Sequence, residues 1–206
     1  MKRKPINRHL YFFLSALVLC SCSKNETQFY TDGEQPRLAI FSNKSNNILS
    51  CLIDGKSWRT PDRTTSGFIA NTRYEVYIDK QTSSNAQDTL LFSWTGYYIN
   101  ESQNGATLIL KLPVAKDFSV LDLNRLALQR IQVDTTNGYF SSSIPELANG
   151  SVKAAGNIYF HTAQFDSIGI GVYAGKISGL FDADFYPKKI TSGRFDHFIE
   201  PRQIHF

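Results

Sequence analysis

The feature that most constrains the fold of this chain is an alternation of apolar and polar or small residues with a period of two. It runs through residues 74–79, 90–95, 107–112, 158–160 and 168–172, where apolar side chains occupy every second position. Successive side chains of a β-strand point to opposite faces of its sheet. The alternation therefore predicts several strands, each with one face more buried than the other.

Dipeptides typical of tight hairpin turns accompany this pattern. They are Asp54-Gly55, Asn104-Gly105, Asn137-Gly138 and Asn149-Gly150. Such residues adopt the positive φ angles that two-residue hairpin loops require, and several of them border the alternating segments. The spacing predicts strands joined by antiparallel hairpins.

Helical patterning is confined to residues 119–128, where Ser119 and Asp122 have the spacing of a capping box. We therefore expect an all-β fold, an antiparallel β-sandwich with at most one short helix. A lipocalin-like barrel is the alternative, because strands that line a barrel alternate in the same way.

The first residues have the three parts of a secretory signal. Basic residues precede an apolar run over residues 10–20, and small or polar residues follow it. The run is far shorter than the roughly 20 residues of a membrane-spanning helix, so residues 1–21 are predicted to be a cleaved signal peptide. The polar residues 22–36 are predicted to be a flexible tether, and residues 37–206 a single β-rich domain.

The charge of the chain depends on this processing. The whole sequence carries 22 Lys and Arg against 18 Asp and Glu, but four of the basic residues lie within residues 1–21. The remaining 18 basic residues balance the acidic ones. The mature chain is formally neutral, which argues against a nucleic-acid partner.

Residues Leu19, Cys20, Ser21 and Cys22 resemble a bacterial lipobox, with an aliphatic residue three positions before the cysteine and a small residue just before it. The resemblance implies a diacylglycerol on the Cys22 sulfur, cleavage before Cys22 and acylation of the new amine. Each buried methylene contributes about 0.8 kcal/mol, so two or three acyl chains form a lasting anchor. Ser23 after the cysteine implies the outer membrane, on either its periplasmic or its exposed face.

Two further motifs resemble an uncharacterised family of outer-membrane lipoproteins of the Bacteroidota type. Cys51-Leu-Ile-Asp-Gly-Lys-Ser-Trp58 resembles the opening motif of that family, and Ile177-Ser-Gly-Leu-Phe181 and Ile190-Thr-Ser-Gly-Arg-Phe-Asp196 resemble its closing strands. The resemblance implies a β-rich envelope domain of unknown function and supplies no catalytic residues. We expect Trp58 to pack in the core, and Gly179 and Gly193 to mark bulges or close backbone contacts.

The best candidates for a ligand site are Trp94, Tyr97 and Tyr98, because aromatic faces pack against sugar rings and Tyr adds a polar tip. Trp94 has the same parity as Leu90 and Phe92, which favours the core for it. Tyr97 and Tyr98 are adjacent in a strand and so occupy opposite faces.

Other chemistry has little support in the sequence. The mature chain keeps Cys22 and Cys51, so no disulfide is expected, and Cys51 is predicted to be buried and inert. His161, His197 and His205 lack a recognised ligand spacing, so we expect no metal.

The glycine-rich residues 169–175 are followed by a strand pattern instead of a helix, with Ile170 and Val172 continuing one strand. A nucleotide loop needs a helix N-terminus for the phosphates, so we expect no cofactor.

Three functions remain open. The first is a non-enzymatic module, anchored to the membrane, that binds a glycan, a peptide or a protein. The second is a carrier of a lipid or small molecule in a barrel cavity. The third is a glycan hydrolase, which would require two of Asp182, Asp184 and Asp196 to converge in a cleft with a raised pKa on one of them. Asp182 and Asp184 are predicted to share one face of a strand.

Overall fold

The computed structural model describes residues 32–60, 74–82, 87–98, 105–147 and 153–206, and these residues are mostly β. The strands are β1 (Ile48–Ile53), β2 (Lys56–Arg59), β3 (Tyr74–Asp79), β4 (Asp88–Tyr98), β5 (Ala106–Val114), β6 (Arg130–Val133), β7 (Tyr139–Ser142), β8 (Ala155–Gly169), β9 (Val172–Phe185), β10 (Lys188–Ile199) and β11 (Ile204–His205). Two short 3-10 helices, η2 (Val120–Leu126) and η3 (Pro201–Gln203), complete them. The predicted β character is confirmed, and η2 lies where helix was expected.

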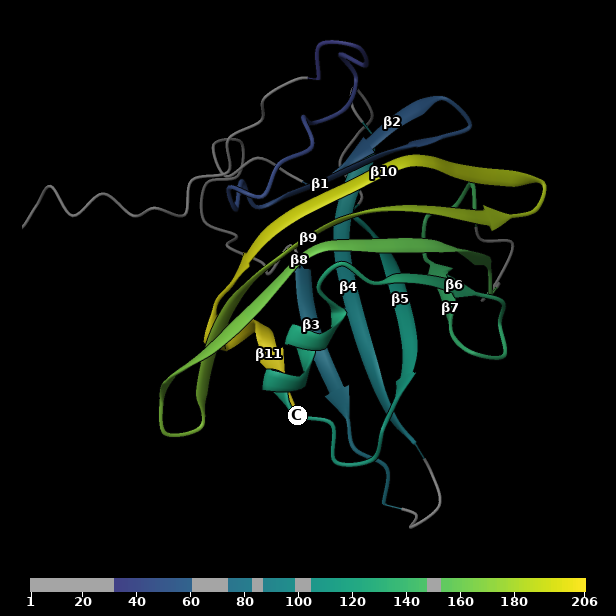
Figure 1. Ribbon diagram of the computed structural model, residues 1–206. Coiled ribbons are helices and arrows are strands. Elements are labelled where there is room, and N and C mark those ends of the chain that lie inside the picture. Colours follow the sequence, from purple (N-terminus) through teal and green to yellow (C-terminus); the bar gives the residue numbers. More distant parts are fainter. Residues whose placement is uncertain (1–31, 61–73, 83–86, 99–104, 148–152) are drawn as a thin grey trace, which may run out of the picture.

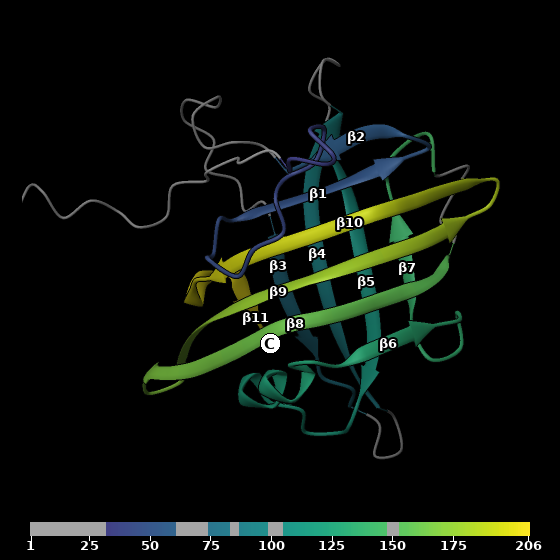
Figure 2. The same ribbon diagram turned by 45° about the horizontal axis from the view of Figure 1, so that its top comes forward.

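All the strands belong to one continuous sheet. Its order is β11-β3-β4-β2-β1-β10-β9-β8-β6, with β5 pairing to β4 and β7 pairing to β5. Every pair is antiparallel except β11 with β3, so the sheet is mixed. It curls so strongly that β3, β4, β5 and β7 lie behind β8, β9 and β10 and run across them (Figures 1 and 2). The result is a curled half-barrel in place of the two distinct sheets that a sandwich would have.

The corner between the two halves lies where β4 changes partner. Most of β4 pairs with β3 and β5, but its last two residues pair with β2, Tyr97 opposite Arg59 and Tyr98 opposite Trp58. Gly96 stands just before this change. A Cβ there would lie 2.5 Å from the Arg59 carbonyl oxygen and 2.7 Å from the Trp58 ring. Glycine is therefore required for the close approach that turns the corner.

Aromatic rings fill the concave side of the curled sheet. Trp94 of β4 lies with its ring centroid 6.2 Å from that of Phe181 in β9 and 5.7 Å from that of Phe195 in β10. Phe160 of β8 packs edge-on against Phe195 at 5.9 Å. Large aromatic side chains bury the most apolar area per residue, so this cluster holds the two halves together.

The turns agree with the sequence only in part. Asp54-Gly55 forms the predicted hairpin between β1 and β2, with φ angles of 47° and 79°. The prediction of a hairpin at Asn137-Gly138 is wrong, because β6 pairs with β8 and β7 with β5. The Asp134 side chain instead shapes this loop by accepting bonds from the backbone N–H groups of Thr136 and Asn137. Asn104, Asn149 and Gly150 lie outside the described residues.

The glycine-rich segment after β8 also differs from its prediction. Ile170 and Gly171 do not continue a strand but form the turn between β8 and β9, with Gly171 at a φ of 67°. Gly169 and Val172 face each other across this turn. The alternation of Ile168, Ile170 and Val172 thus crosses a hairpin, which a period of two cannot distinguish from one longer strand.

The motifs from the two ends of the chain become neighbours. The first is the β1–β2 hairpin, and the other two lie in β9 and β10, with β10 paired between β1 and β9. Trp58 is fully buried, as expected. A Cβ on Gly179 would collide with the Tyr159 carbonyl oxygen, so the predicted close backbone contact at Gly179 is confirmed.

Candidate functional site

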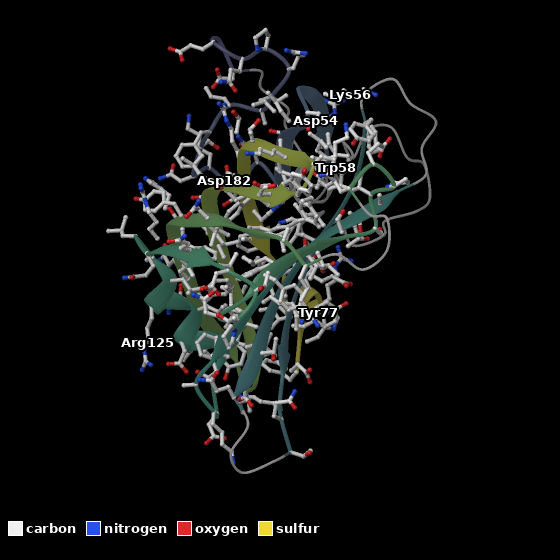
Figure 3. All side chains as sticks on the ribbon, turned by 90° about the vertical axis from the view of Figure 1, so that its right-hand side faces the viewer. Asp54, Lys56, Trp58, Tyr77, Arg125 and Asp182 are labelled. Atoms are coloured by element: carbon white, nitrogen blue, oxygen red, sulfur yellow. The ribbon has the colours of Figure 1, made fainter. Side chains whose placement is uncertain are left out.

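An open hollow lies on the outer side of the sheet, over β6, β8, β9 and β10, with a volume of about 510 Å³. This outer face is opposite the concave face that carries the aromatic core. The side chains that line it include Arg130, Asn157, Tyr159, Leu180, Asp182 and Arg194. Asp182 is labelled on this face in Figure 3. We call this feature the outer hollow.

Strand register places these side chains together. Arg130 pairs with Tyr159, Tyr159 with Leu180, and Leu180 with Arg194, which makes one row across four strands. Directly paired residues in a sheet have their side chains on the same face and within contact distance. The row is therefore continuous although its members come from sequence positions far apart.

A β-bulge in β10 shapes one side of the outer hollow. Between Ile190 and Gly193 the strand carries one residue more than its partner β9, and Ser192 within this step has a φ of 52°. A Cβ on Gly193 would lie 2.6 Å from the ring of Phe181, so only glycine fits beneath that ring. Bulges bend a strand locally and redirect its side chains, and here the bend falls at the rim. The predicted bulge at Gly193 is confirmed.

A guanidinium and an amide–carboxylate pair face the hollow. The Arg130 guanidinium carbon lies 5.8 Å from the centroid of the Tyr159 ring. Among the described residues no carboxylate pairs with Arg130. Beside it, Asn157 Nδ2 donates a hydrogen bond of 3.0 Å to Asp182 Oδ1. The hollow thus offers a cation on an aromatic ring, which can bind carboxylate oxygens, next to an amide and a carboxylate, which can bind hydroxyl groups.

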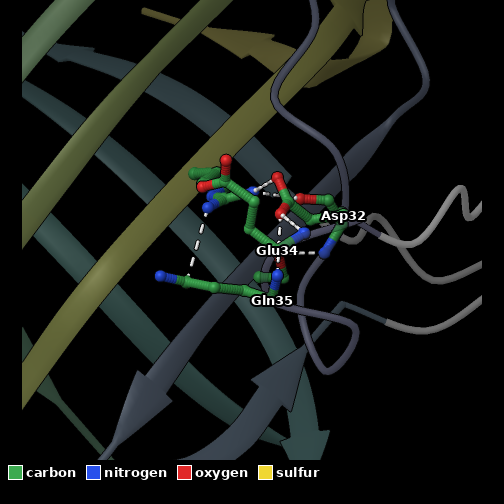
Figure 4. Close-up of polar contacts among 6 residues, drawn as sticks. Asp32, Glu34 and Gln35 are labelled. Atoms are coloured by element: carbon green, nitrogen blue, oxygen red, sulfur yellow. Dashed lines mark hydrogen bonds and ion pairs between the residues drawn. The ribbon is translucent and has the colours of Figure 1, made fainter.

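Arg194 has a different role, because it is already paired. Its Nη1 donates to Asp32 Oδ2 at 2.5 Å and to the Ala39 carbonyl oxygen at 2.9 Å (Figure 4). Asp32 Oδ1 in turn accepts from the backbone N–H groups of Glu34 and Gln35. The hydrogen bond from Arg194, followed by that from Gln35, lowers the pKa of Asp32. These contacts hold the start of residues 32–47, here the covering segment, against the outer face of β10.

Asp196 fixes the other end of the covering segment. It accepts bonds from the backbone N–H groups of Ser45 (2.9 Å) and Asn46 (3.2 Å) and from the Ser42 hydroxyl. Burial raises the pKa of Asp196, although these hydrogen bonds act in the opposite direction. Its side chain is enclosed by the covering segment and does not line the outer hollow.

The three acidic candidates therefore lie in different surroundings. Asp182 and Asp184 share the exposed face of β9, as predicted. Asp182 bonds to Asn157, whereas Asp184 pairs with Lys189 at 3.4 Å and caps the Tyr186 N–H. Each carboxylate has its own partners, and none of the contacts links two of them.

The aromatic candidates are divided between the two faces of β4. Trp94 is 2% exposed and Tyr98 8% exposed, and both belong to the core cluster. Lys56 Nζ lies 5.9 Å from the centroid of the Tyr98 ring. Tyr97 points to the opposite face and is half-buried. The structure does not bring these three side chains to one surface.

The histidines are spread over the sheet. His161 Nδ1 lies 3.1 Å from the Thr162 hydroxyl, His205 Nε2 lies 3.6 Å from Glu75 Oε1, and His197 is buried in the core. In the part of the chain that the structure describes, no three His, Cys, Asp or Glu side chains come close enough to hold a metal ion.

Cys51 is fully buried, and this burial raises the pKa of its thiol. Within residues 32–60, 74–82, 87–98, 105–147 and 153–206, no helix has the length and apolarity needed to cross a membrane. Cys22, the predicted lipidation site, lies outside the described residues.

Arg130, Asn157 and Tyr159 were not identified from the sequence. Ile158 and Phe160 are the apolar positions of an alternating segment. Asn157 and Tyr159 occupy the other parity, which predicts that they lie on the more exposed face of the strand. Arg130 could not be assigned to the same site, because its pairing with Tyr159 depends on the register of β6 against β8.

Comparison of the chain with protein-family models, curated proteins and solved structures gives no match, so the outer hollow must be interpreted from its own chemistry.

Proposed function

We propose that this chain is an outer-membrane lipoprotein whose β domain binds an acidic glycan, without catalysis, in the outer hollow. The observation that carries the proposal is the position of Arg130 against the Tyr159 ring, beside the Asn157–Asp182 pair, in a hollow open to solvent. A guanidinium pairs well with a sugar carboxylate, and amide and carboxylate groups bind sugar hydroxyls.

The dimensions of the hollow support a ligand of this class. Its 510 Å³ falls within the roughly 300–1,000 Å³ of typical ligand pockets. Leu180, 39% exposed, adds an apolar contact for the faces of sugar rings. A polar ligand with apolar ring faces matches this lining better than a lipid does.

The concave side of the sheet gives less support to the carrier hypothesis. Phe160, Phe181 and Phe195 pack there against the rings of β4, and each is at most 4% exposed. A carrier needs an inner face that encloses a void. The aromatic packing therefore favours binding on the outer face.

The anchor proposed at Cys22 is ten residues before Asp32, which is bonded to Arg194 of β10. Ten extended residues span at most about 35 Å. The domain would therefore stay close to the membrane surface, where envelope and extracellular glycans are concentrated.

The proposal is tested with the mature lipoprotein, purified in detergent from its membrane and titrated by calorimetry. The probes are oligogalacturonate and a neutral galacto-oligosaccharide of the same length. We expect the acidic probe to bind and Arg130→Gln to weaken its binding at least tenfold. Arg125→Gln is the matched control, because Arg125 is 80% exposed on η2 and pairs with Asp122 away from the hollow (Figure 3).

Equal affinity for both probes, or equal losses in the two Arg variants, would contradict an acidic glycan in the outer hollow. The same samples test the absence of catalysis. After prolonged incubation, mass spectrometry should show probe chains of unchanged length. Shortened chains that disappear with Asp182→Asn would replace binding by hydrolysis as the function.

A further inference from the structure

The hairpin of β8 and β9 extends beyond the rest of the sheet. Pairing of β9 with β10 ends at Gly175, and pairing of β8 with β6 covers only residues 156–159. Residues 166–174 therefore form a two-stranded ribbon that projects from the molecule, at the lower left of Figure 1.

The end of this ribbon is apolar and exposed. Ile168 is 62% exposed, Ile170 is 105% exposed and Val172 is 39% exposed. Residues 167–175 include no charged side chain. Single exposed apolar residues are common on proteins, but several on one projection mark a site of interaction.

Aromatic residues lie next to the apolar tip, on the side toward the rest of the sheet. The rings of Tyr173 and Phe206 meet edge-on with centroids 6.4 Å apart, and Phe206 is 68% exposed. Tyr77 and His205 stack next to them on the outer face of β3 and β11. Tyr173 is an aromatic side chain with a polar tip, the kind that prefers the boundary between lipid and water.

The hydroxyl next to the turn has a partner within the hairpin. Ser167 Oγ donates to the Gly169 carbonyl oxygen at 2.9 Å, and Ser167 pairs with Tyr173 across the ribbon. A segment can enter an apolar medium cheaply only when its polar groups are bonded internally. The hydroxyl of Ser167 meets this condition.

We propose that the tip of the β8–β9 hairpin, Ile168, Ile170 and Val172, inserts into the surface of a lipid bilayer. It gives the domain a second membrane contact besides the anchor proposed at Cys22, and in this respect the inference rests on the proposed function. The tip enters the boundary between headgroups and acyl chains, and Tyr173 and Phe206 lie at the level of the headgroups.

The size of the patch favours lipid over a protein partner. A standard protein interface uses roughly 20–30 residues on each side. Here three exposed apolar side chains, Ile168, Ile170 and Val172, lie at the end of a narrow hairpin. A narrow, projecting tip buries its apolar side chains most fully in a lipid bilayer, because the lipids can rearrange around it. A second copy of the chain would cover it incompletely.

The anchor and the tip can reach the same membrane. The distance from Asp32 to the tip can be followed along β9. Asp32 is bonded to Arg194, and Arg194 pairs with Leu180 of β9. Leu180 is ten residues from Ile170 at the tip. At the rise of a strand these ten residues span about 33 Å. The ten residues from Cys22 to Asp32 span at most about 35 Å, so the tether is long enough.

The test places a fluorescent probe at the tip. Ile170→Cys is labelled with an environment-sensitive nitrobenzoxadiazole in the full mature lipoprotein and reconstituted in phosphatidylethanolamine–phosphatidylglycerol vesicles. Cys51 is fully buried and does not compete for the label. Tyr186→Cys is the matched control, because Tyr186 is 89% exposed in the turn at the other end of β9.

We expect blue-shifted emission at position 170, with at least twofold quenching by a nitroxide on the lipid acyl chain, and water-like, unquenched emission at position 186. Identical spectra at the two positions overturn the proposal. A blue shift at 170 that the lipid nitroxide does not quench assigns the tip to a protein partner and also overturns it.

Failure of the anchor gives a different result. In that case any flotation of the labelled proteins with the vesicles in a density gradient depends on the tip alone. The emission at position 170 on adding vesicles to the unanchored protein then still reports whether the tip meets lipid.

Discussion

Toward the end of β10, from Arg194 to Ile199, both faces of the strand are covered, but by different means. On the inner face Phe195, His197 and Ile199 pack among the aromatic rings of the core. On the outer face Arg194 and Asp196 lie under the covering segment and are held by hydrogen bonds to it.

The difference shows what each face requires. The inner face needs apolar volume, and side chains of similar size can replace one another at modest cost. The outer face is polar and needs its particular partners, because a buried donor or acceptor left without one is unfavourable. The first kind of burial follows from strand alternation, whereas the second depends on a segment more than 140 residues away in sequence.

The largest effect is expected on the inner face, from Phe195→Ala. Phe195 contacts Trp94, Phe160 and Phe181, and its loss leaves a cavity among large rings. We expect the free energy of unfolding to fall by about 3–5 kcal/mol, measured by urea titration. Leu180→Ala on the exposed face of β9 should cost far less, and equal losses would mean that the inner face is not the principal core.

A smaller loss is expected on the outer face, from Asp196→Ala. Ser42, Ser45 and Asn46 would lose their acceptor, so unfolding should become easier by about 3 kcal/mol and proteolysis should begin in the covering segment. Asp196→Asn should cost less, because burial raises the pKa of Asp196 and so disfavours its charge. If Asp196→Asn and Asp196→Ala lowered the free energy of unfolding equally, the shape and hydrogen bonds that Asn retains would contribute nothing. The distinction between the two faces would then weaken.

The third prediction concerns His197, a buried ionisable side chain on the inner face of β10. Among the described residues neither ring nitrogen of His197 has a hydrogen-bond partner, and its ring stacks on Tyr74 at 3.9 Å. Burial lowers the pKa of His197 from 6.5 to about 3. The unfolded chain therefore binds a proton near pH 6.5, and the folded chain binds one only near pH 3.

The stability that neutral His197 preserves is complete above pH 6.5 and is lost as the pH falls toward 3. From pH 7 to pH 5 the loss should be about 2 kcal/mol. His197→Phe should remove this part of the pH dependence, measured as the difference between the two proteins in urea titrations at both pH values. The same dependence in both proteins would show that His197 is accessible to protons in the folded state.

Sequence alone predicted the strands that have one apolar face. Residues 74–79 and 90–95 lie in β3 and β4 with the expected parity, and Asp54-Gly55 makes the expected turn. These features are local, so a single segment contains all the information they need.

The features that the sequence did not predict depend on distant pairing. The curl of the sheet requires β4 to leave its neighbours at Gly96 and join β2, and the outer hollow requires Arg130 to pair with Tyr159. Asp32, which was predicted to belong to the tether, is bonded to Arg194 of β10. This charged partner holds a polar segment that has few apolar side chains of its own to bury. Periodicity contains no information on which strands pair or in what register.

The place of β1 in the sheet has a consequence for how the chain is made. Ile48 pairs with Asp196, and β3 takes β11 as its parallel neighbour, so early strands have partners that are synthesised much later. Pairing across such long separations is slow to form and leaves strand edges open meanwhile. We expect the chain to stay incompletely folded, and dependent on chaperones, until β10 and β11 are available to pair with β1 and β3.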